Sequence, residues 1–211
     1  MKKEYQGKFI VLEGGPGSGK SVQHEKIIEM GGWKGFREPG GTLYGELVRE
    51  VLQERHDLNI SPNASLFGYM TCRANLVDTE IRPMLEKGTN IALDRYWPST
   101  YAYQGAEGIS RVNIMAMVGI VTGDLVYPDL FIFYNVDPKI GQERKNKNKQ
   151  QQDRYDVKKL DFQKRVRENY FELMTMDEES KKRWVVIDAN GTIEEVHEAT
   201  VDVLRRRKLI E

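Results

Sequence analysis

The sequence predicts an α/β protein in which a parallel sheet lies between two layers of helices. Four short apolar runs, each flanked by stretches with helical periodicity, are typical of buried strands: residues 9–13, 90–94, 130–136 and 184–188. A shorter fifth strand is expected to end at Phe36 and Arg37. Parallel strands need crossover connections, and the helical stretches supply them. We therefore expect a three-layer α/β/α fold with a sheet of about five strands.

Length and composition favour one globular domain over residues 1–211. The chain has 211 residues, of which 39% are hydrophobic, enough for one substantial core. Its 32 basic and 32 acidic residues balance, so no overall charge favours nucleic acid or a membrane surface as a partner. No apolar run approaches the roughly 20 residues of a membrane span, and we expect a cytoplasmic protein. The single cysteine, Cys72, excludes an internal disulfide and is expected to be a buried thiol.

A glycine-rich segment follows the first predicted strand and matches the phosphate-binding pattern GxxxxGK[ST]. Its residues are Gly14, Gly15, Pro16, Gly17, Ser18, Gly19, Lys20 and Ser21. In this setting, backbone N–H groups and the N-terminus of the next helix, predicted over residues 20–30, bind phosphate oxygens. The Lys20 ammonium can reach the β- and γ-phosphates, and the Ser21 hydroxyl can hold Mg²⁺. The segment predicts a site for a nucleoside triphosphate.

Two charged residues at the end of the strand over residues 90–94 point to the same chemistry. Asp94 can orient water on Mg²⁺ as the second acidic element of such sites, although it could instead cap the next helix. Arg95 would project into the same crevice, where a guanidinium fork suits a second phosphate.

Two further segments are ambiguous when taken alone. The loop over residues 37–42 could bring its backbone close to a ligand or form a simple turn before a helix over residues 43–53, and its Glu38–Pro39 bond could be cis. The polar tract over residues 144–154 is either a solvated loop or a mobile lid.

Read together, these segments resemble the thymidylate kinase family over about residues 9–189. The resemblance rests on the glycine-rich loop, the loop over residues 37–42, the helix segment LFGYMTCR at 66–73 and the segment DRYWPSTYAYQG at 94–105. YPDL at 127–130 and DRYD at 153–156 extend it. The resemblance implies an enzyme that transfers the γ-phosphoryl group of ATP to thymidine 5′-monophosphate (dTMP), with Mg²⁺, as a homodimer.

The resemblance also implies roles for individual residues. Those implied to bind dTMP are Glu38, Arg49, Tyr69, Arg73, Arg95, Thr100, Tyr103 and Gln104. Those implied in phosphoryl transfer are Lys20, Asp94, Arg95, Arg144 and Arg154, and those implied at Mg²⁺ are Ser21, Glu38 and Asp94. Tyr69 and Arg73 lie four residues apart on one helical face, so a ring and a hydrogen-bond donor could act jointly on a base, and a Gln104 amide could meet its Watson–Crick edge.

The chain departs from the family at the loop and at the base-binding helix. Pro16 stands where the family commonly has an acidic residue that meets the sugar hydroxyl, and Tyr69 stands where it usually has Phe. The loop also lacks the arginine of some members, so a cation is expected from a lid over about residues 142–156, from Arg144, Lys147, Lys149 or Arg154.

These departures leave alternatives open. They motivate a related nucleoside monophosphate kinase with another acceptor. A P-loop ATPase or switch would use water as its acceptor, and a degenerate binding protein would keep the fold without catalysis. The region over residues 109–121, with Met115, Met117 and Val118, could supply a dimer face or only core packing.

Overall fold

The structure is a computed structural model that describes residues 5–122, 127–147, 153–156 and 158–211. Five parallel strands form one sheet in the order β2-β3-β1-β4-β5. They are β1 (Phe9–Gly14), β2 (Trp33–Arg37), β3 (Asn90–Asp94), β4 (Leu130–Asn135) and β5 (Trp184–Asp188). The predicted sheet is confirmed, including the short strand that ends at Arg37.

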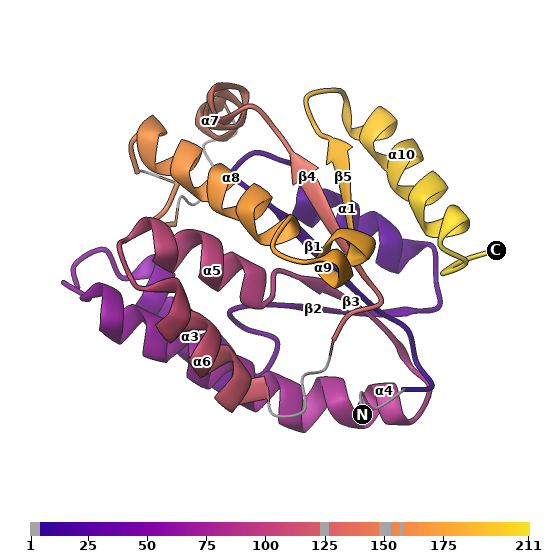
Figure 1. Cartoon of the computed structure of the whole chain (residues 1–211), viewed down its shortest axis with the longest axis horizontal. Helices are drawn as coiled ribbons and strands as arrows, with labels where there is room; N and C mark the ends of the chain where they lie inside the picture. The colour runs from indigo at the N-terminus through magenta and orange to yellow at the C-terminus, as the bar shows by residue number, and fades with distance from the viewer. Residues whose placement is uncertain (1–4, 123–126, 148–152, 157) are drawn as a thin grey trace.

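Helices cover both faces of this sheet, which gives three layers (Figure 1). Helices α1 (Lys20–Glu29) and α10 (Ile193–Arg206) lie together on one face. The helices of the other face are α3 (Pro62–Leu76), α4 (Arg82–Glu86), α5 (Trp97–Ala106), α6 (Arg111–Thr122) and α8 (Leu160–Met174). The remaining short helices are α2 (Leu43–Arg49), α7 (Pro138–Lys147) and α9 (Glu178–Arg183).

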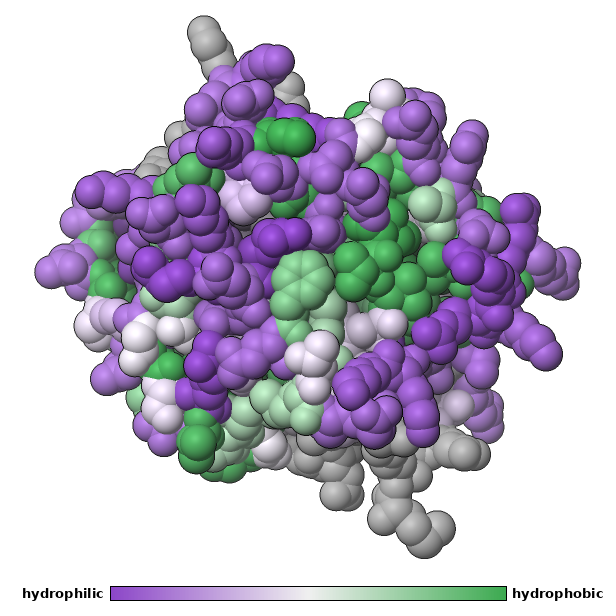
Figure 2. All heavy atoms as spheres, turned by 45° about the horizontal axis from the view of Figure 1, so that its top comes forward, coloured by the Kyte–Doolittle hydropathy of each residue, from purple (hydrophilic) through white to green (hydrophobic). Residues whose placement is uncertain are grey.

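The alternation of side chains along β1 explains why there are two cores. Successive residues of a strand face opposite sides of the sheet. Phe9 and Val11 pack with α3, α5, α6 and α8, whereas Ile10 and Leu12 pack with α1 and α10. The strand is apolar on both faces because both are covered. Outside these cores the surface is mostly hydrophilic, as Figure 2 shows for one side of the molecule.

Two predicted helices are interrupted by single π-helical turns. The helix expected over 43–53 is α2 followed by η1 (Glu50–Glu54). The helix that contains the 66–73 segment runs from α3 through η2 (Val77–Ile81) into α4. Pro83 accounts for η2, because its ring cannot pack against the carbonyl of Thr79 in a regular α-helix. Amphipathic periodicity alone does not register such a local widening.

The strand register brings the polar segments to one edge of the sheet. Asp94 at the end of β3 lies level with Leu12 of β1 and with Arg37 of β2. The loop after β1, the loop after β2 and the residues after β3 therefore meet at the carboxyl ends of the strands, where open α/β sheets bind ligands. Within the described residues, no helix is long and apolar enough to cross a membrane.

Candidate active site

The glycine-rich loop between β1 and α1 has the backbone conformation that its glycines permit. Gly17 and Gly19 adopt φ of 69° and 77°, the left-handed region that strains other residues. A Cβ on Gly17 would lie 2.2 Å from the carbonyl oxygen of Gly141, so α7 packs directly against the loop. Helix α1 begins at Lys20 with Gly19 as an N-cap that offers no side-chain cap, which leaves its N-terminal N–H groups available to an anion.

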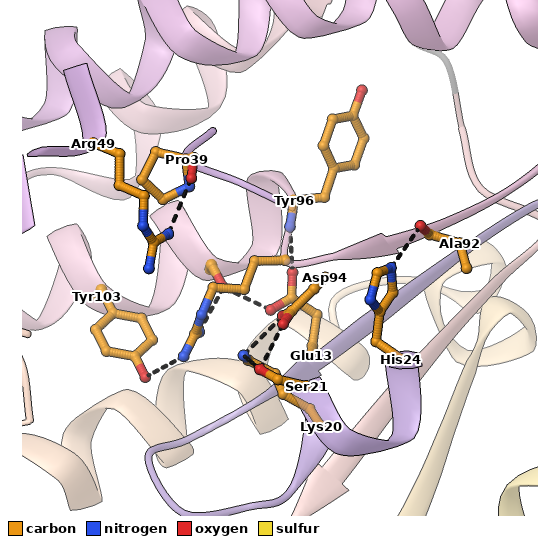
Figure 3. Close-up of polar contacts among 12 residues, drawn as sticks. Glu13, Lys20, Ser21, His24, Pro39, Arg49, Ala92, Asp94, Tyr96 and Tyr103 are labelled. Atoms are coloured by element: carbon orange, nitrogen blue, oxygen red, sulfur yellow. Dashed lines mark hydrogen bonds and ion pairs between the residues drawn. The ribbon is translucent and has the colours of Figure 1, made fainter. Parts of the chain in front are cut away.

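Lys20 and Ser21 converge on Asp94, as Figure 3 shows. The Lys20 ammonium lies 2.7 Å from Asp94 Oδ1, and the Ser21 hydroxyl donates to Asp94 Oδ2 at 2.7 Å. Burial and the nearby Arg95 charge lower the pKa of Lys20, and Asp94 partly offsets them. Burial alone would raise the pKa of Asp94, but Lys20 and Arg95 hold it far below its usual range. The site thus keeps an ionised carboxylate beside a hydroxyl at the foot of the loop.

A second buried charge pair joins the loop after β2 to α3. Arg73, 2% exposed, donates from Nε and Nη2 to Glu38 Oε2 at 2.9 and 2.7 Å, and from Nη2 to Thr100 Oγ1 at 3.0 Å. Burial raises the pKa of Glu38 to about 7 despite the Arg73 charge. The other carboxylate oxygen, Oε1, has no hydrogen-bond partner among the described residues. The Glu38–Pro39 peptide bond is cis.

Two further arginines face the same space. Arg95 has φ of 71° and donates to Ser99 Oγ at 3.0 Å and to the Tyr103 hydroxyl at 3.4 Å. Arg49 donates to the carbonyl oxygen of Pro39 at 3.0 Å (Figure 3). Both guanidiniums line a large cleft that also contains the glycine-rich loop and Asp94.

A smaller cavity adjoins this cleft and gathers the predicted base-binding residues. Its walls include Tyr69, Arg73, Thr100, Tyr103 and Gln104. Four residues line both spaces: Glu38, Gln53, Arg95 and Asp153. The structure therefore brings the residues predicted for the acceptor nucleotide into one connected site next to the loop predicted for the triphosphate.

Tyr155 also lines the smaller cavity. Its hydroxyl accepts a hydrogen bond of 2.8 Å from Gln104 Nε2 and lies 3.4 Å from Ser65 Oγ. Its ring packs edge-on against Tyr103 at 5.2 Å between centroids, and the residue is 4% exposed. This residue belongs to the DRYD segment but was not predicted to enter the site.

The predicted lid is partly helical. Arg144 lies on α7, where its guanidinium donates to the carbonyl oxygens of Gly17, Ala189, Asn190 and Gly191 at 2.6 to 3.3 Å. These contacts hold α7 to the glycine-rich loop and to the loop after β5. Arg154 instead donates to the carbonyl oxygen of Ile60 at 3.4 Å. Of the other expected cations, Lys147 ends α7, and Lys149 lies outside the described residues.

Gln53 and Glu13 were also missed from the sequence. Gln53, on η1, donates to the Tyr69 hydroxyl at 3.4 Å, and no sequence signal marks it. Glu13 is a fully buried acid at the end of β1 that accepts three hydrogen bonds. The signal that could have identified Glu13 is an acidic residue at the end of an otherwise apolar strand.

Comparison with known proteins decides the family. A family model described as thymidylate kinase matches residues 12–200. The chain belongs to the thymidylate kinase family. A thymidylate kinase from Thermoanaerobacter sp. (strain X514) is 35% identical over 212 residues, which cover 95% of this chain and 98% of the relative. One from Pseudoalteromonas translucida (strain TAC 125) is 36% identical, with 94% of this chain and 95% of the relative covered.

A solved structure agrees with this assignment. The crystal structure of thymidylate kinase from Ehrlichia chaffeensis superposes with a TM-score of 0.74 at 28% identity, covering 94% of this chain and 98% of that one. The thymidylate kinase family thus accounts for the fold, and it makes this chain an ATP-dependent nucleoside monophosphate kinase.

Proposed function

We propose that the connected site carries out γ-phosphoryl transfer from ATP to dTMP, with Mg²⁺, within a single domain. The observation that carries this proposal is the juxtaposition of two spaces: the cleft at the glycine-rich loop and the cavity lined by Tyr69, Arg73 and Gln104. A donor phosphate in the first and an acceptor base in the second would direct the two phosphates toward each other. Such alignment is the main task of a phosphoryl-transfer enzyme.

The residues at the foot of the loop fit Mg²⁺. Hydroxyl and carboxylate oxygens from Ser21 and Asp94 are the hard donors that this ion takes. Glu38 lines the same cleft and adds Oε1, a carboxylate oxygen with no hydrogen-bond partner in the part of the chain that the structure describes. Within the described residues, no cluster of three or more His, Cys, Asp or Glu could hold a metal. A site of few protein ligands suits Mg²⁺, which keeps water and phosphate oxygens. When bound, it would neutralise phosphate charge.

The positively charged side chains of the site divide between the phosphates of ATP, the donor, and the phosphate of dTMP, the acceptor. We assign Lys20 to the β- and γ-phosphates, because its ammonium already lies inside the loop. Arg49 and Arg95 hold the acceptor phosphate, since both guanidiniums line the cleft. Arg144 adds positive charge beside the loop, and Arg154 joins it only if the lid segment moves from its contact at Ile60.

The smaller cavity recognises the base. Tyr69 and Tyr103 offer ring faces, and the Gln104 amide can donate and accept at a pyrimidine edge. Arg73 and Thr100 form the polar end of this cavity through their mutual hydrogen bond. Aromatic packing with a few placed polar groups is the usual composition of a selective ligand site.

A related kinase with another monophosphate acceptor is the second candidate. The specific observation is the Tyr69 hydroxyl, which is buried with Gln53 and adds polarity to the base cavity. Measuring ADP formation with each nucleoside monophosphate at equal concentration separates the two. Preference for dTMP supports the proposal, whereas a stronger preference for another monophosphate supports the alternative. Turnover with water alone would instead indicate an ATPase.

Exposed apolar residues support a homodimer. Val112 and Ile120 on α6 are 77% and 81% exposed, and Phe67 on α3 is 61% exposed. Within the region over 109–121, Val118 is instead buried, and Met115 and Met117 pack against the core. A second copy would cover the exposed residues, and sedimentation of the purified chain measures its mass.

We propose a cytoplasmic location because the proposed substrates are free nucleotides.

A further inference from the structure

Glu13 lies beneath the candidate site without lining it. It is the residue before Gly14 in β1, its side chain is fully buried, and it borders neither the cleft nor the base cavity. Its other β1 neighbours, Phe9 to Leu12, are all apolar. A carboxylate costs several kcal/mol to bury unless it is hydrogen-bonded, so its presence here needs a physical reason.

Glu13 holds the backbone at Arg95. The N–H of Tyr96 donates to Glu13 Oε1 at 2.9 Å (Figure 3), and the N–H of Arg95 donates to the carbonyl oxygen of Leu12 at 2.9 Å. Two consecutive N–H groups are thus fixed to β1. Between them lies the left-handed φ of Arg95, a conformation that a non-glycine residue keeps only when its surroundings impose it.

Glu13 also orients the groups that hold the Arg95 side chain. Ser99 Oγ donates to Glu13 Oε2 at 2.6 Å, and Arg95 Nη1 donates to Ser99 Oγ at 3.0 Å. A hydroxyl has one proton and a carboxylate only accepts. Ser99 Oγ also lies 2.9 Å from the Tyr170 hydroxyl, and when its proton points to Glu13, a lone pair of Ser99 is left for Arg95. The Tyr170 hydroxyl of α8 donates to the same Oε2 at 2.7 Å.

We propose that Glu13 is a positioning residue, which sets the Arg95 guanidinium for the acceptor phosphate through Ser99 and through the N–H of Tyr96. The proposal rests on the role of Arg95 given under the proposed function. Glu13 lines neither the cleft nor the base cavity, so we do not assign it a catalytic role. This positioning role explains why a buried acid lies near the end of β1, where an apolar side chain could fill the same space.

The test is a double-mutant cycle read out by dTMP binding in calorimetry. Glu13→Gln keeps the side-chain volume but presents either an NH₂ group or a weaker acceptor to Ser99. We expect dTMP to bind about tenfold more weakly, the usual effect of losing a hydrogen bond to a charged group. ATP binding should change less than twofold. In an Arg95→Met background, Glu13→Gln should weaken dTMP binding less than twofold, because the group that it positions is gone.

Controls keep the result specific. Asp129→Asn alters another carboxylate that binds β1, through the N–H of Phe9 at 2.8 Å, and should leave dTMP binding unchanged. Ser99→Ala should repeat the pattern of Glu13→Gln if the latter does not fold. Equal losses with and without Arg95, or no loss in folded Glu13→Gln, would overturn the proposal. If Arg95→Met itself binds dTMP normally, the Glu13 inference also fails, while dTMP turnover by the unmodified chain still reports on the proposed function.

Discussion

Gln104 donates to the hydroxyl of Tyr155 at 2.8 Å inside the cavity proposed for the base. With Tyr155 in place, that cavity has a volume of about 30 Å³. A cavity of about 150 Å³ is known to hold a benzene ring, so 30 Å³ holds a water or two but no pyrimidine. We therefore expect the base to enter when Tyr155 withdraws and gives up its bond to Gln104.

This relationship predicts that Tyr155 slows the binding of dTMP. Tyr155→Ala empties the cavity, and we expect a higher association rate constant for dTMP in stopped-flow fluorescence. Tyr155→Phe keeps the ring but removes the hydroxyl, with its contacts to Gln104, Ser65 and Glu107, and should give a smaller increase. Phe171→Ala, which alters another aromatic residue packed against the same core, is the control. Equal association rates in all four proteins would contradict the expectation.

Lys20 should be essential for turnover. Lys20→Met removes the ammonium proposed for the γ-phosphate, and we expect kcat to fall about a hundredfold or more, the loss typical of removing one preorganised charge from a transition state. Lys26→Met on the same helix, outside the cleft, serves as its match and should retain kcat within about twofold. A Lys20→Met enzyme with near-normal kcat would refute the assignment.

Three glycines of the loop should differ in tolerance to alanine. Gly17→Ala meets the Gly141 carbonyl at 2.2 Å and also strains φ, Gly19→Ala only strains φ, and Gly15→Ala does neither. A left-handed φ costs about 1–2 kcal/mol in a residue with a Cβ. Gly15→Ala should therefore have the highest melting temperature of the three variants, Gly19→Ala a lower one and Gly17→Ala the lowest. A Gly17→Ala protein that melts no lower than Gly19→Ala would show that α7 does not pack on the loop as described.

The buried carboxyl of Glu38 should make stability depend on pH. Its pKa is raised from 4.5 to about 7 by burial, so between these values the folded state binds a proton that the unfolded state has lost. The unfolding free energy of the wild type, measured relative to that of Glu38→Gln, should therefore decrease as the pH rises from 4.5 to about 7. Above that pH it should stay constant. The full change is at most about 3.5 kcal/mol, since one pKa unit corresponds to about 1.4 kcal/mol.

Urea unfolding of both proteins at pH 5 and pH 8 measures this change. Glu46→Gln is a useful comparison, because its half-exposed carboxyl is paired with Arg37 and has a lowered pKa. The difference in unfolding free energy between the wild type and Glu46→Gln should not decrease between pH 5 and pH 8. A difference between wild type and Glu38→Gln that does not vary with pH would mean that Glu38 is ionised throughout.

Local patterns predicted what depends on local sequence. Four apolar runs and the short segment ending at Phe36 and Arg37 predicted the five strands, and the loop pattern placed Lys20 and Ser21. A strand, a tight turn and a helix are each encoded by neighbouring residues. That Asp94 meets Lys20 also followed, since parallel strands end at one edge. These are properties of periodicity and connectivity.

Contacts between distant segments could not be predicted in this way. Tyr155 meets Gln104 across 51 residues, and Glu13 meets Ser99 and Tyr170 across 86 and 157 residues. Nothing in the spacing of these residues specifies the pairings. Gln53 lies on η1, a π-helical turn that a periodic apolar pattern does not distinguish from an α-helix.

The reaction proposed for this site transfers the γ-phosphoryl group of ATP to dTMP. The most direct measurement is the formation of thymidine diphosphate from ATP, Mg²⁺ and dTMP, followed by chromatography beside a reaction without dTMP. We predict equal amounts of ADP and thymidine diphosphate with dTMP, and almost no ADP without it. ADP formation at the same rate in both reactions, with no thymidine diphosphate, would contradict the account.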